Sequence, residues 1–98
     1  MERQITATVL QAAGVSPGGL DEYSDHRAAP GGLTVPRDWK QEIREELADA
    51  WNYGKWDACE QYPGFLAGDP EACHQYEQTL RAMVHVARAW RELHTRAC

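Results

Sequence analysis

Apolar side chains recur at helical spacing in the C-terminal third of the chain, where the pattern is clearest. Two rows of mainly apolar positions, each with steps of three and four residues, lie next to one another on a helical wheel. They are Cys73, Tyr76, Leu80, Met83, Ala87, Trp90, His94 and Ala97, and then Ala82, Val86, Ala89 and Leu93. A face this broad is typical of a helix packed by two neighbours. Asp69-Pro70-Glu71 has the sequence of a helix start, so we expect a helix over 69–97.

The middle of the chain carries a second helical pattern. One side of it is apolar and consists of Trp39, Ile43, Leu47, Ala50, Trp51 and Ala58. We expect this side, with both of its tryptophans, to lie in the core. Pro36 suits a first helical turn and Pro63-Gly64 breaks the pattern, so a helix over 36–60 is predicted. Gly54 lies inside it and predicts either a close packing contact or a kink, since glycine costs about 1 kcal/mol relative to alanine in a helix.

The N-terminal third is less regular. Residues 1–13 predict a short helix that ends at Gly14. Two Pro-Gly-Gly runs make residues 14–35 a long irregular loop, with room for one helical turn over Asp21–His26. Such a loop is either solvated or a segment that contacts a ligand. The predicted fold is one all-α domain over 1–98, in which two long helices form an antiparallel hairpin.

Length and composition narrow the classes of function. The chain has 98 residues and a formal net charge of -5, which argues against nucleic acid as a general partner because phosphate binding needs a basic surface. No apolar run reaches membrane-spanning length, and no signal peptide is evident. The three cysteines have no metal-site spacing, so reduced thiols in a cytoplasmic protein are expected. A chain this short buries only about 60% of its unfolded surface, and we expect it to self-associate into a bundle as a homodimer or homotetramer.

Acidic residues form a stripe on the middle helix. Glu42, Glu46 and Asp49 fall within a narrow arc at helical spacing, and Glu45 lies beside them. Like charges at this spacing repel one another by a few tenths of a kcal/mol per pair. A divalent cation would relieve the repulsion, and so would a row of basic side chains.

The run EELADAWNY at 45–53 resembles the second conserved element of the all-α nucleotide pyrophosphohydrolases, the MazG-like and dimeric-dUTPase-like superfamily. Glu46 and Asp49 match that family's E-x-x-D pair. The resemblance implies these two as catalytic residues and a Mg²⁺ site formed by Glu42, Glu45, Glu46 and Asp49 over a nucleoside triphosphate. It also implies dimers or tetramers. The family's upstream E-x-x-E has no clear copy here, because Glu22–Asp25 lies in the predicted loop and Glu42–Glu45 lies on the same helix.

Other side chains complete this hypothesis. Arg81 and Arg88 lie on one edge of the C-terminal helix and would bind phosphate, while Tyr53 or Trp56 would contact the base. The same arginines could instead pair directly with the carboxylates across the two long helices. That alternative would make the stripe structural.

Two further functions compete with the magnesium-dependent pyrophosphohydrolase. The chain could be a small acidic inhibitor or adaptor of the phage type, used against host defence or for host takeover. Its aromatic and acidic surface would then bind a host protein without catalysis. It could also be a structural oligomer that takes no ligand.

Overall fold

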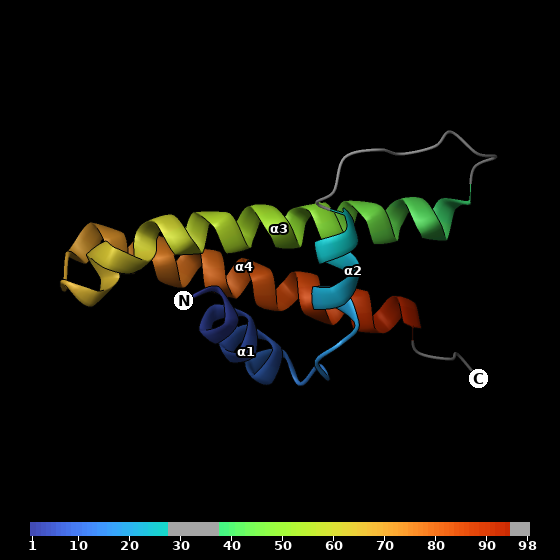
Figure 1. Ribbon diagram of the computed structural model, residues 1–98, viewed down its shortest axis with the longest axis horizontal. Helices are drawn as coiled ribbons and strands as arrows, with labels where there is room; N and C mark the ends of the chain where they lie inside the picture. Colours follow the sequence, from blue (N-terminus) through green and yellow to red (C-terminus); the bar gives the residue numbers. More distant parts are fainter. Residues whose placement is uncertain (28–37, 95–98) are drawn as a thin grey trace.

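The computed structural model describes residues 1–27 and 38–94, and this part of the chain contains helices and no strand. The helices are α1 (Glu2–Ala13), α2 (Leu20–Arg27), α3 (Trp39–Leu66) and α4 (Pro70–His94) (Figure 1). The predicted all-α class is confirmed. Within the described ranges, no helix combines the length and the apolar character needed to cross a bilayer.

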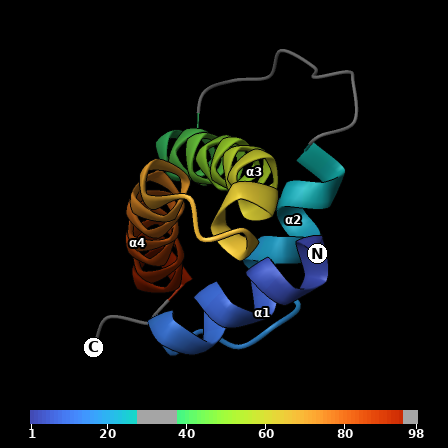
Figure 2. The ribbon, with the colours of Figure 1, turned by 90° about the vertical axis from the view of Figure 1, so that its left-hand side faces the viewer.

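The two long helices form the central pair of the fold. α3 and α4 lie side by side and run in opposite directions, joined by a short connection at one end (Figure 1). α1 packs against both of them, and α2 packs against α3. Viewed from the end in Figure 2, α1 and α2 lie on one side of the α3–α4 pair, and no described helix covers the other side.

The core lies where all four helices meet. Trp51 of α3 and Ala87 of α4 are fully buried, and Ile5 of α1 and Leu20 of α2 close the core from the other side. Tyr23 of α2 packs its ring against Trp90, with 5.0 Å between the ring centroids. These contacts bury apolar surface from all four helices. Neither of the short helices, α1 or α2, could bury its apolar side chains alone.

The helical turn predicted over Asp21–His26 within the loop is confirmed, and α2 extends it by one residue at each end, to Leu20–Arg27. The helix forms because Leu20 and Ser24 are both 0% exposed, so one side of this mainly polar segment is held in the interior. Asp21 supports the start of the helix by accepting a hydrogen bond from the Gly18 amide at 2.8 Å. Residues 28–35 lie outside the described part of the chain.

The predicted end of the middle helix near residue 60 is also wrong, because α3 continues through Pro63 to Leu66. A proline inside a helix removes one backbone hydrogen bond. Here aromatic packing stabilises the last turn of α3. The Phe65 ring stacks on the Tyr76 ring of α4 with centroids 4.4 Å apart, and the centroid of the Tyr62 ring lies 5.8 Å from that of Tyr76. Tertiary contact therefore outweighs the local breaker.

The other predicted ends shift by a few residues. α3 begins at Trp39 after Asp38, whose carboxylate accepts hydrogen bonds from the amides of Lys40 and Gln41. α4 begins at Pro70, one residue after the predicted start, and is described as far as His94. Pro36 and Ala97 lie outside the described ranges, so their predicted places are not tested.

The apolar side predicted for α3 divides into a buried and an exposed part. Trp51 and Ala58 are buried as predicted, but Trp39 is 68% exposed and Ile43 is 46% exposed, so their predicted place in the core is wrong. The reason is geometric: in the register set by Gly54 and Met83, Ile43 lies level with the described end of α4, and no described residue of α4 is level with Trp39. The sequence pattern alone could not show how far along α3 the neighbouring helix extends.

Gly54 marks a close packing contact. α3 continues through it without interruption, and a Cβ atom built at this position would lie 2.6 Å from Cγ of Met83 on α4. Of the two predicted roles, the packing contact is therefore confirmed.

The thiols of Cys59 and Cys73 are free, as expected from the sequence. Burial, followed by the charge of Glu2, raises the pKa of the Cys59 thiol. Burial also raises the pKa of the neighbouring Tyr76 hydroxyl. The folded state favours the neutral form of both groups, so their contribution to stability is intact at neutral pH and is lost as the pH rises through the raised pKa values.

Candidate functional site

The exposed side of α3 carries most of the residues that the sequence singled out. Glu46 is exposed, whereas Glu42, Glu45 and Asp49 are half-buried on the same helix. Among the described residues, no group of three or more His, Cys, Asp or Glu side chains is placed to hold a metal ion. The magnesium site stays a prediction of the sequence.

The predicted phosphate ligands lie on the side of α4 that faces α1. Arg88 donates a hydrogen bond to the Ala12 carbonyl at the end of α1, with 3.5 Å between the atoms. Arg81 is exposed and lies beside α1, where it lines a depression with Thr8 and Val9. The structure therefore does not bring these arginines together with Glu46, which lies on the side of the pair that α1 leaves uncovered.

Arg91 has a structural role that the sequence did not reveal. Its guanidinium donates to the carbonyls of Ala13 and Gly14, at 3.2 and 3.3 Å. These carbonyls belong to the last turn of α1, which ends with Gly14 in the left-handed conformation. A cation at the C-terminal end of a helix is favoured by the helix dipole, so Arg91 holds α1 against α4.

Tyr53 and Trp56 form an exposed aromatic pair on α3. Tyr53 is 65% exposed and Trp56 is 48% exposed. Their rings meet edge to face, with centroids 5.9 Å apart. Neither residue belongs to the hydrophobic core or to the side chains packed against it. The fold therefore leaves a large part of the apolar surface of this pair exposed.

A shallow depression of about 540 Å³ lies nearer the start of α3. Its lining is mainly apolar and comes from Trp39, Ile43, Leu47 and Ala50, with Glu42 and Glu46 beside them. We call the exposed residues Trp39, Ile43, Glu46, Ala50, Tyr53 and Trp56 the outer face of α3. This face combines large apolar side chains with carboxylates, a combination that is common where proteins bind one another.

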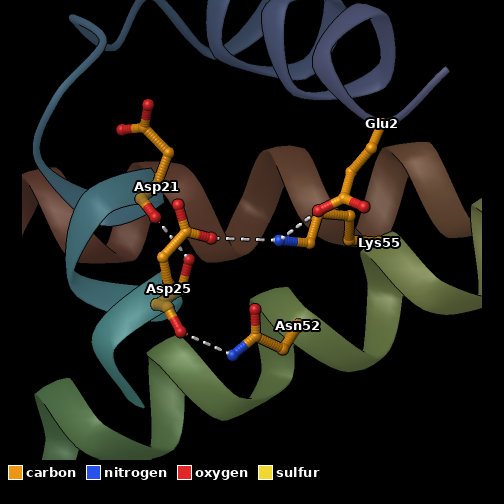
Figure 3. Close-up of polar contacts among 6 residues, drawn as sticks. Glu2, Asp21, Asp25, Asn52 and Lys55 are labelled. Atoms are coloured by element: carbon orange, nitrogen blue, oxygen red, sulfur yellow. Dashed lines mark hydrogen bonds and ion pairs between the residues drawn. The ribbon is translucent and has the colours of Figure 1, made fainter. Parts of the chain in front are cut away.

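A second polar constellation joins α1, α2 and α3. Lys55 is only 5% exposed, and its Nζ lies 2.9 Å from Oε1 of Glu2 and 3.5 Å from Oδ1 of Asp25 (Figure 3). One turn earlier, the buried Asn52 donates from Nδ2 to the carbonyl of Ser24 at 2.9 Å. We call these five residues the Lys55 cluster.

A cavity of about 530 Å³ opens next to the Lys55 cluster, between α1 and α2. Its charged lining consists of Glu2, Arg3, Asp21, Asp25 and Lys55. The Lys55 ammonium group is already engaged by two carboxylates. Lys55 therefore connects α3 with α1 and α2 through ion pairs, and its ammonium group is not open to act as a nucleophile or to bind an anion.

The Lys55 cluster leads to two contrasting expectations for stability. Asn52→Ala removes a buried hydrogen bond and should lower the free energy of unfolding by about 1–3 kcal/mol. Lys55→Met should change it by less than about 1 kcal/mol, because Glu2 and Asp25 are exposed and regain water when the ion pairs are lost. Urea unfolding of both variants measures the two values. A loss as large for Lys55→Met as for Asn52→Ala would contradict this assignment.

Comparison with protein-family models, with curated proteins and with solved structures gave no match to this chain. The likeness to nucleotide pyrophosphohydrolases therefore stays a prediction. Glu46, Tyr53 and Trp56 were predicted from the sequence, but the Lys55 cluster was not. A possible signal was the polar row of Gln41, Asn52 and Lys55 on the side of α3 away from its apolar stripe.

Proposed function

We propose that this chain is a protein-binding module and that the outer face of α3 is its binding surface. The observation that carries the proposal is the exposure of Tyr53 and Trp56 next to an otherwise complete core. Tryptophan and tyrosine are the side chains most enriched at the energetic centres of protein interfaces.

The charges of this face indicate the kind of partner. Glu46 is exposed and lines the apolar depression on the same side of α3. Carboxylates around apolar anchors favour a partner with a complementary basic surface and accelerate its association. We expect the partner to insert apolar side chains between basic ones.

Site-specific photo-crosslinking tests the proposal. The full chain carries a photoreactive amino acid in place of Tyr53 or Trp56, and the matched control carries it at His74, an exposed position on α4. Illumination in cells should give a discrete crosslinked protein from positions 53 and 56 and not from position 74. The purified captured protein should then bind the wild-type chain directly. Equal crosslinking at all three positions would overturn the proposal.

The nucleotide hypothesis has its own assay. Magnesium-dependent release of pyrophosphate from nucleoside triphosphates, lost in Glu46→Gln and Asp49→Asn, would support a hydrolase. The protein-binding proposal expects no such release from the purified chain.

A further inference from the structure

We propose that the cavity between α1 and α2 binds a small aliphatic zwitterion, a molecule with an ammonium group at one end and a carboxylate at the other. The cavity has a volume of about 530 Å³ and is lined by charged side chains from α1, α2 and α3. Its volume is in the range of small-molecule sites in proteins, about 300–1,000 Å³. The proposal goes beyond the binding of a protein partner at the outer face of α3 and does not depend on it.

The α2 wall of the cavity carries two carboxylates one helical turn apart, Asp21 and Asp25. Figure 3 shows them one above the other on this helix. Oδ1 of Asp21 accepts a hydrogen bond from the Gly18 amide at 2.8 Å, and Oδ1 of Asp25 lies 3.5 Å from Nζ of Lys55. Within the described chain the second oxygen of each carboxylate is not engaged. Because like charges at this spacing repel one another, an ammonium group between them is stabilised by both.

The α1 wall offers a positive charge in the form of Arg3. Among the described residues, no carboxylate lies within ion-pair distance of the Arg3 guanidinium. Arg3 and Asp21 therefore line the same cavity without contacting one another. Arg3 also lies in the first turn of α1, where the N-cap residue Met1 makes no side-chain hydrogen bond to the backbone amides. The guanidinium and the positive end of the helix dipole both favour a carboxylate at this side of the cavity.

The balance of charge in the lining selects a zwitterion over a simple ion. Lys55 is compensated by Glu2, the nearer of its two partners at 2.9 Å. The other charged groups of the lining are Asp21, Asp25 and Arg3. An anion is repelled by the two aspartates, and a cation leaves the guanidinium without a counterion. A zwitterion pairs with both walls.

A buried acceptor beside the cavity is a separate sign that the polar groups here have a second arrangement. Asn52 is 2% exposed, and its Oδ1 has no hydrogen-bond partner among the described residues. Figure 3 shows this oxygen on the side of Asn52 that faces Lys55. Side chains three residues apart on a helix are neighbours, so the Lys55 ammonium group can turn to Oδ1 when a ligand ammonium group takes over Asp25. The exchange offsets the cost of a buried acceptor without a donor.

The uncharged part of the lining indicates the body of the ligand. It consists of Thr6, Ala7, Leu10 and Pro17. These side chains are small or apolar and suit methylene groups rather than further polar atoms. The class of ligand is therefore an aliphatic amino acid whose ammonium and carboxylate groups are separated by methylene groups.

Titrations followed by amide ¹H–¹⁵N chemical shifts of the full chain test the proposal. The amino acids are 4-aminobutyrate and 6-aminohexanoate, and the matched controls are the amines and the carboxylates of the same chain lengths. At least one amino acid should shift the amide signals of Ala7 and Gly18 at millimolar concentration. The compounds with a single charge should bind at least about tenfold more weakly, because each loses one charge-assisted contact.

Three variants locate the site. Arg3→Gln and Asp21→Asn each remove one charge and should weaken binding of the amino acid by about tenfold or more. Arg3 is exposed, and asparagine at position 21 keeps an oxygen to accept from the Gly18 amide, so both variants should fold. The control Glu22→Gln removes an exposed carboxylate that neighbours Asp21 but is not part of the lining, and it should leave the affinity unchanged.

Circular dichroism checks the folding of the variants, and the Arg3→Gln result decides if Asp21→Asn is unfolded. The absence of shifts with both amino acids would overturn the proposal. Amines that bind as tightly as the amino acids would also overturn it, because Arg3 would then have no part in binding. An affinity that the folded cavity variants leave unchanged would place the site elsewhere and overturn it as well.

Discussion

Trp51→Ala is expected to lower the free energy of unfolding by about 3–5 kcal/mol, the range for deleting a large buried aromatic side chain. Trp51 is 0% exposed at the centre of α3, within the core that joins the four helices. The vacated volume cannot collapse easily, because α4 is held close to α3 at Gly54. Because a small domain has a net stability of about 5–15 kcal/mol, this loss should be visible as partial unfolding at moderate temperature.

Trp56→Ala supplies the matched control for this prediction. It makes the same substitution five residues later on the same helix, at a side chain that is 48% exposed and outside the core. Its effect on stability should be within about 0.5 kcal/mol, as for most surface substitutions. Thermal and urea unfolding of both variants measure the difference. Equal destabilisation by the two changes would show that the burial assigned to Trp51 and Trp56 is wrong.

Gly54→Ala is expected to destabilise the protein even though alanine favours helix by about 1 kcal/mol over glycine. The added Cβ atom would lie 2.6 Å from Cγ and 3.1 Å from Sδ of Met83. Forcing a methyl group into a packed contact costs about 1–3 kcal/mol, so the clash exceeds the gain in propensity. Urea unfolding should show a net loss of about 1 kcal/mol or more.

A double-mutant cycle separates the two terms. In a Met83→Ala background the clash is absent, and Gly54→Ala should then stabilise the protein through propensity alone. The sign of the Gly54→Ala effect should therefore reverse between the two backgrounds. The same sign in both would mean that close packing against Met83 is not the reason for glycine at this position.

The sequence was sufficient for the two long helices and for the buried row Tyr76, Met83, Ala87 and Trp90 of α4, but local signals misplaced the limits of the helices. The Pro63-Gly64 pair is a strong breaker in isolation, and aromatic packing of Tyr62 and Phe65 on Tyr76 holds α3 helical beyond it. The single turn predicted over Asp21–His26 understates α2 for a related reason, since this helix depends on burial of Leu20 and Ser24 by segments distant in sequence. Local propensity carries no information about such contacts.

The candidate site residues also differ in how far the sequence could identify them. Tyr53 and Trp56 could be identified because helical spacing places them beside the acidic stripe, away from the apolar row. The polar row of α3 includes Lys55, but its ion-pair partners Glu2 and Asp25 lie at least thirty residues away on other helices, and the sequence does not indicate this pairing. Trp39 was assigned to the core because periodicity shows which residues share a face but not how far a neighbour extends over it.

The affinity of the photo-captured protein for two variants of the full chain tests the central claim most directly. The protein-binding account predicts that Trp56→Ala weakens binding at least about tenfold, as expected for a buried aromatic anchor, while Glu46→Gln has a smaller effect. Both positions are exposed, so both variants should fold like the wild type. Unchanged affinity in Trp56→Ala, together with magnesium-dependent pyrophosphate release that Glu46→Gln abolishes, would contradict the account.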